Sequence, residues 1–106
     1  MPLPLVIISS FFYRLNSISH GIFDNLRRPH FYEGQRGLER AQSDYSLGRS
    51  ILSELERLAQ EAEAGEYPET KAHIEHLITC LTPEVQRVKD ILDNLGVDFS
   101  EAPSGL

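Results

Sequence analysis

The fold is decided by residues 38–95, LERAQSDYSLGRSILSELERLAQEAEAGEYPETKAHIEHLITCLTPEVQRVKDILDNL. Apolar and small residues recur there at alternating steps of three and four, over residues 38–62 and again over residues 78–95. This spacing places them on one stripe of a helix and is typical of coiled coils. The first seam consists of Leu38, Ala41, Tyr45, Gly48, Leu52, Leu55, Ala59 and Ala62, and the second of Ile78, Leu81, Val85, Val88, Leu92 and Leu95.

Between the two seams lies the segment Ala64-Gly65-Glu66-Tyr67-Pro68. We expect Gly65 to adopt the left-handed conformation that ends one helix, and Pro68 to start the next. Small residues such as Gly48 in the first seam would let a neighbouring element approach closely. The sequence therefore predicts an antiparallel helical hairpin.

The second arm contains a helix-start signal in its middle, Thr82-Pro83-Glu84. Thr is a good N-cap and Pro is favoured at the first helical position. Yet the apolar seam keeps its phase across Pro83. We therefore expect residues 69–95 to form two helices or one kinked rod, ended by Gly96.

The N-terminal region is apolar and has steps of three and four of its own. Its stripe, which predicts a packed helix over about residues 5–27, consists of Ile8, Phe11, Leu15, Ile18 and Ile22. The alternatives are a mitochondrial presequence within residues 1–30 and peripheral contact with a membrane. The apolar run is too short for a transmembrane segment. The chain is expected to divide into four parts: an apolar N-terminal helix or targeting segment over residues 1–30, a linker over 31–37, a hairpin domain over 38–99 and a flexible tail over 100–106.

Two helices alone bury too little apolar surface to be stable, so something must cover the hairpin. Three covers satisfy this requirement: the N-terminal helix, a second copy of the chain, or another protein. The fold class predicted is all-α, a hairpin completed as a three-helix bundle or by dimerisation.

The distribution of charge and the cysteine content reduce the number of function classes that the chain can belong to. Residues 1–37 contain four arginines and two acids, whereas residues 38–106 contain six bases and fourteen acids. An acidic surface without an aromatic, basic stripe argues against nucleic-acid binding. The single cysteine, Cys80, excludes an internal disulfide framework and fits a cytoplasmic protein.

No motif for catalysis is evident. The segment Gly34-Gln35-Arg36-Gly37 lacks the Lys and Ser/Thr of a P-loop, and no Gly-x-Ser-x-Gly elbow occurs. The glutamates of the first arm are expected on exposed turns, where nothing raises their pKa for acid catalysis. We expect no enzyme activity and no cofactor.

One cluster suggests an alternative function as a metal-binding or regulatory protein. His73, His76 and Cys80 stand at i, i+3 and i+7 on one helix, and both residue types are zinc ligands. A structural zinc site needs a fourth ligand, such as Glu69. Two surface histidines beside a packed thiol are the simpler interpretation.

The leading prediction is a non-catalytic protein interaction module, such as an adaptor, a complex subunit or a small chaperone-like binder. Its apolar seams would bind a helix of another protein or of a second copy, and flanking acids would select the partner. The residues expected to contact the partner are Ile51, Leu55, Leu58, Ile74, Leu77 and Ile91.

Two stretches resemble known helical binding proteins. Residues 47–55, LGRSILSEL, resemble part of a Golgi-type SNARE motif, but Leu58 stands at the position of its central glutamine. The hairpin with Gly65 at its turn and Pro83 downstream is similar in layout to tubulin-binding cofactor A. Both resemblances imply a helical binding protein, and no residue role is transferred from either.

Overall fold

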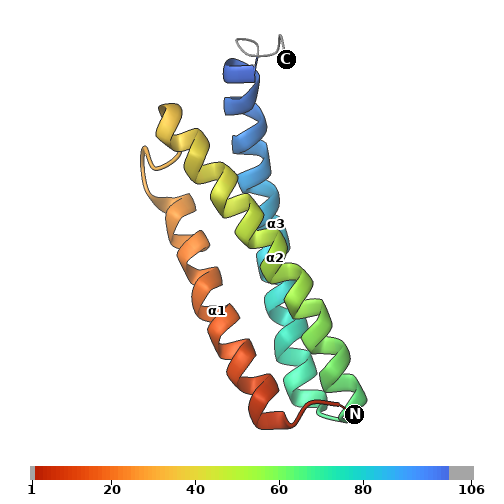
Figure 1. The fold of residues 1–106 in the computed structure, drawn as a ribbon. Coiled ribbons are helices and arrows are strands. Elements are labelled where there is room, and N and C mark those ends of the chain that lie inside the picture. Colours follow the sequence, from red (N-terminus) through yellow and green to blue (C-terminus); the bar gives the residue numbers. More distant parts are fainter. Residues whose placement is uncertain (1, 101–106) are drawn as a thin grey trace.

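The structure is a computed structural model that describes the backbone of residues 2–100 and the side chains of residues 2–95. Three helices follow one another in the described residues: α1 (Leu5–Arg27), α2 (Gly34–Ala64) and α3 (Pro68–Ser100). Each helix runs antiparallel to the one before it (Figure 1). The predicted all-α hairpin, completed by an N-terminal helix as a three-helix bundle, is confirmed. The predicted tail lies almost entirely outside the described residues.

The hairpin of α2 and α3 forms the larger interface, and the residues of its predicted seams are buried or partly buried. Leu55, Leu81 and Val88 are fully buried. A Cβ atom added to Gly48 would lie 2.6 Å from Cγ2 of Val85. A neighbour therefore approaches closely at Gly48, and it is a side chain of α3 rather than a backbone.

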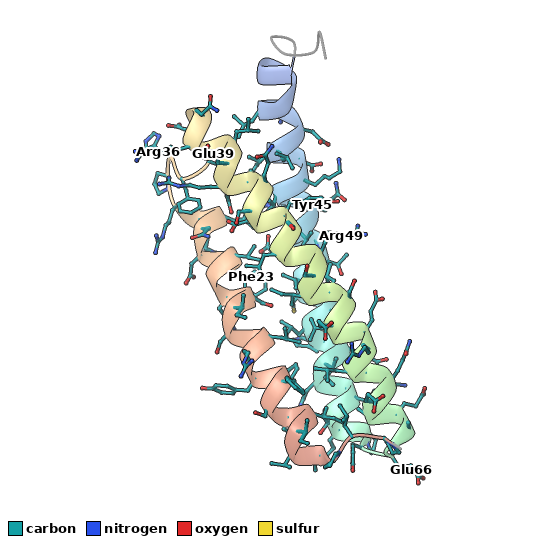
Figure 2. All side chains as sticks on the ribbon, viewed as in Figure 1. Phe23, Arg36, Glu39, Tyr45, Arg49 and Glu66 are labelled. Atoms are coloured by element: carbon teal, nitrogen blue, oxygen red, sulfur yellow. The ribbon has the colours of Figure 1, made fainter. Side chains whose placement is uncertain are left out.

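The turn between α2 and α3 differs from the prediction in one residue. Gly65 has a right-handed φ of −84°, and Glu66 adopts the left-handed conformation, with φ of 62°. Figure 2 shows Glu66 projecting from this turn. Glycine is needed at position 65 for another reason, because any Cβ there would collide with the ring of Tyr67. Pro68 begins α3 as expected.

The second arm is one continuous helix rather than two. α3 runs through Pro83 and past Gly96 to Ser100. The Thr82 hydroxyl does not cap a new helix but donates to the carbonyl of Ile78 at 2.7 Å. The favourable packing of a seam that stays in phase on both sides of Pro83 outweighs the local start signal.

α1 packs on the hairpin with part of the predicted stripe: Ile8, Leu15 and Ile22 face the core, and two other members do not. Phe11 and Ile18, expected in the stripe, remain 45% and 37% exposed, whereas Ser19 is fully buried. The Ser19 hydroxyl donates to the carbonyl of Leu15 at 2.8 Å, which satisfies it without a partner from another helix. The face towards the core consists of Ile8, Phe12, Leu15, Ser19, Ile22 and Leu26, again in steps of four and three.

Polar contacts fix the far end of α1 and the linker. Asn25 and Tyr32 both donate to the Asp44 carboxylate, at 3.0 and 2.5 Å. Partial burial, the hydrogen bond to Asp44 and the charge of Asp44 raise the pKa of the Tyr32 phenol well above its ordinary value. α2 begins at Gly34, four residues before the expected start of the hairpin at residue 38, with Gly37 buried against the Tyr32 backbone.

Candidate protein-interaction site

The residues expected to contact a partner lie mostly inside the bundle. Five of them are at most 5% exposed: Ile51, Leu55, Leu58, Ile74 and Leu77. Ile91 is partly buried and packs against the same core. α1 covers much of the apolar face of the hairpin to which these residues belong. A partner can therefore reach most of them only if α1 moves. Their contact with a partner stays a prediction.

Two grooves remain open, one on each side of α1, because a single helix does not cover the whole apolar face of the hairpin. The α1–α2 groove has a volume of about 310 Å³. Its walls and floor are formed by Leu3, Phe11, Arg14 and Leu15 from the N-terminal region, and by Glu54, Arg57, Leu58 and Glu61 from α2. The floor is apolar and the rim is charged.

The charged rim of the α1–α2 groove is held by its own contacts. The Leu3 amide donates to the Glu61 carboxylate at 2.9 Å, which ties the N-terminal segment to the end of α2. Figure 1 shows this segment crossing beside the α2–α3 turn. Arg57 lies 3.8 Å from Glu54 in an exposed ion pair. Both acids thus stand on one wall, opposite Arg14.

The α1–α3 groove, on the other side of α1, has a volume of about 330 Å³. It is lined by Phe12, Asn16, His20 and Phe23 of α1, and by His73, His76, Leu77 and Cys80 of α3. Phe23 lies on the side of α1 that faces the hairpin (Figure 2). Leu58 and Leu77, two of the predicted contact residues, therefore belong to the two grooves.

The histidine and cysteine cluster lies in the α1–α3 groove. His76 Nε2 is 3.6 Å from Cys80 Sγ, and both side chains are exposed. His20 of α1 lines the same groove, and no pattern in the sequence indicated this. Within the described part of the chain, no three His, Cys, Asp or Glu side chains are grouped closely enough to hold a metal ion. The metal-binding alternative stays a prediction, which a zinc titration followed by thermal melting tests.

The outer surface of α1 is unusually apolar for an exposed helix. The large apolar side chains of α1 that are more than a third exposed are Leu5, Val6, Ile7, Phe11, Tyr13 and Ile18. Val6 and Tyr13 are 73% and 74% exposed. Contiguous surfaces of this kind usually mark interaction sites. Among the described helices, none is long and apolar enough to cross a bilayer.

Comparison of the chain with models of protein families, with curated proteins and with solved structures finds no match.

Proposed function

We propose that the protein is a non-catalytic helical interaction module, an adaptor, complex subunit or small chaperone-like binder, whose α1–α2 groove receives a helix of a partner. The observation that supports this most is the groove itself, with Phe11, Leu15 and Leu58 at its apolar centre. An amphipathic helix binds such a groove through its apolar face. Glu54 and Glu61 on the rim select among partners by charge.

The exposed part of α1 extends this groove. Phe11 is 45% exposed although it lines the groove, so a partner can bury it further without any rearrangement of the bundle. Full burial of a Phe side chain is worth about 1.5–3 kcal/mol, so burying the 45% of Phe11 that is still exposed contributes about 1 kcal/mol to association. Leu58, in contrast, is only 5% exposed, and a charge at that position would disturb folding and binding together.

The test is site-specific photocrosslinking in cells that express the full chain. Phe11→p-benzoylphenylalanine keeps the phenyl ring of Phe11 and adds a benzoyl group that brings a photoreactive ketone to the groove. The matched control is the same substitution at Gln86, an exposed position of α3 outside both grooves. We expect discrete protein adducts from position 11 and none at the same masses from position 86. Identical adducts from both positions, or none from position 11, would refute the proposal.

The proposed module is expected in the cytoplasm, because a chain with a single cysteine fits a reducing compartment. A mitochondrial location stays a prediction of the alternative in which residues 1–30 act as a presequence. The two are separated by N-terminal sequencing of the mature protein from cells, since a presequence is removed.

A further inference from the structure

One seam on α1 lies beside its core-facing stripe and borders the α1–α2 groove. Its members, Ile7, Phe11, Arg14 and Ile18, are spaced by four, three and four residues. Phe11 and Arg14 line the groove, and the helical period places Ile7 and Ile18 on the same stripe. The three apolar members are 37–45% exposed. This is coiled-coil spacing on a surface that the described helices cover only in part.

The seam is complementary to itself when two copies lie antiparallel. A two-fold axis midway between positions 12 and 13 places Ile7 opposite Ile18 of the second copy, and Phe11 opposite its Arg14. Apolar side chains then meet apolar ones, and each guanidinium meets an aromatic ring, a favourable cation–π pair. An isologous two-fold interface requires this self-complementarity.

Charge favours the same arrangement. The chain has a net charge of −6, so two copies repel each other over most of their surfaces. Residues 5–23 contain no acid, and Arg14 is their only Lys or Arg. In the antiparallel register, Arg14 of one copy is level with Phe11 of the other, and Phe11 shares its groove with Glu54 and Glu61. The cation of each copy thus faces the α2 wall of the other, where Glu54 and Glu61 outnumber the single base Arg57.

We infer that α1 of a second copy occupies the α1–α2 groove, antiparallel to α1, so that α1 and α2 of two chains form a four-helix bundle. This inference rests on the proposed function and names the partner of that groove. The exposed apolar surface of the seam is modest, so we expect a weak dimer, with a dissociation constant on the order of micromolar or above.

Cysteine crosslinking tests the register. In a Cys80→Ser background, the double variant Ile7→Cys with Ile18→Cys is expected to form a disulfide-linked dimer on mild oxidation. Positions 7 and 18 of one helix lie ~16 Å apart at ~1.5 Å per residue, too far for a disulfide within the chain. For the same reason, neither single-cysteine variant is expected to crosslink in the antiparallel register. Crosslinking of the single variants as readily as the double variant overturns the inference.

Sedimentation velocity from about 1 μM to about 500 μM tests the association itself, on the full chain without cysteine substitutions. We expect the mass to rise from monomer towards dimer, and Ile18→Asp to weaken the dimer by about tenfold or more. The matched control is Val6→Asp, which adds the same charge to the same helix about 100° away from the seam and is expected to have little effect. Circular dichroism of both variants verifies that the helices are retained.

Other outcomes separate this inference from the proposed function. If the chain stays monomeric at the highest concentration, and position 11 crosslinks to a different protein in cells, the inferred dimer is overturned. The proposed function of the groove then stands, with another protein as the partner. If the chain is monomeric, co-floats with phosphatidylcholine vesicles, and no longer does so with Val6→Asp, the inferred dimer is overturned and the seam binds a membrane instead. If position 11 gives no crosslinked adduct and the chain does not self-associate, both proposals are overturned.

Discussion

The α2–α3 interface and the interface of α1 with the hairpin differ in how completely they are packed. Between α2 and α3, small and large residues interlock, as Gly48 does with Val85, and the seam residues are buried or partly buried. α1 contributes only three buried residues, Ile8, Ser19 and Ile22, and one of these is polar. A groove lies open on each side of it. The hairpin is thus the stable body of the molecule, and α1 is a partial cover.

This difference has a consequence for local stability. Burial of apolar area is the main favourable term in folding, and α1 buries less of it than either arm of the hairpin. Elements with few buried apolar contacts open at a lower free energy than the whole domain. Opening of α1 would expose Leu58 and Leu77, the residues at the edges of the two grooves. The predictions below test the contrast between these two interfaces.

The largest effect is expected from a cavity in the hairpin. Leu81 is fully buried on α3, and Leu81→Ala should lower the free energy of unfolding by about 3 kcal/mol, measured by urea denaturation. The matched variant on the cover is Ile8→Ala, at an equally buried position of α1. Ile8→Ala should lower the free energy of global unfolding by less than Leu81→Ala does, and should mainly increase hydrogen exchange in α1. Equal global losses with no local change in α1 would mean that the bundle unfolds as one unit.

A smaller effect is expected at the polar anchor of α1. Asp44→Ala removes the acceptor of both Asn25 and Tyr32, and should cost about 1–2 kcal/mol. The loss should appear as faster hydrogen exchange at the end of α1, while exchange in α3 is retained. Asp90→Ala on the exposed face of α3 removes only a local contact with Gln86 and serves as the control, with a change within about 0.5 kcal/mol.

Two glycines in the two regions should respond in opposite directions. Gly48→Ala places a methyl group against Val85 and should destabilise by about 1 kcal/mol, despite the better helix propensity of alanine. Gly21 of α1 has no atom within 4 Å of an added Cβ, so Gly21→Ala should stabilise by up to about 1 kcal/mol. Thermal melting of the two variants measures this. A stabilising Gly48→Ala would contradict the tight packing of the hairpin.

The smallest effect concerns the pH dependence of the linker contact. The pKa of Tyr32 is raised in the folded state above its ordinary value of 10.0, so its stabilising contribution is complete below pH 10. It is lost as the pH rises through the folded-state pKa. Tyr32→Phe should cost about 0.5–1.5 kcal/mol at neutral pH, and this difference from the unchanged protein should shrink above pH 10. Urea denaturation at a series of pH values measures it.

Lys71 and Lys89 titrate in the same range but do not confound this comparison. Hydrogen bonds to Glu63 and Asp93 raise the pKa of these two exposed lysines. Their contribution is therefore also present below their ordinary pKa of 10.5 and lost as the pH rises. Because both lysines are present in the Tyr32→Phe variant, their effect cancels in the difference. A difference that stays constant to the highest pH would contradict the role of Tyr32.

Much of the fold follows from local patterns in the sequence. The helical hairpin was predicted correctly from the seams of residues 38–62 and 78–95 and from the proline at position 68. Apolar residues at alternating steps of three and four lie together only on one stripe of a helix. The helix of residues 5–27 follows in the same way. The left-handed turn residue was misassigned to Gly65, because the sequence does not show that the Tyr67 ring occupies the space beside it.

The candidate site was predictable only in part. Leu58 and Leu77 were identified from the broad apolar stripe, and both line a groove. Phe11 and Arg14 were not, because the predicted stripe of α1 turned Phe11 towards the core. α1 is apolar over more than half of its circumference, so its pattern does not fix its rotation. His20 could not be linked to His73 and His76, since that juxtaposition needs the packing of α1 against α3.

The sequence by itself determined which segments are helical, where the chain reverses, and which faces must be buried. Those features depend on residues close to each other in the chain. The tertiary structure decided what covers the hairpin, how α1 is rotated, and where the two grooves remain. Hydrophobic burial is non-directional, so the same stripe is satisfied by α1, by a second copy or by another protein. Only the shapes of the packed helices distinguish among these covers.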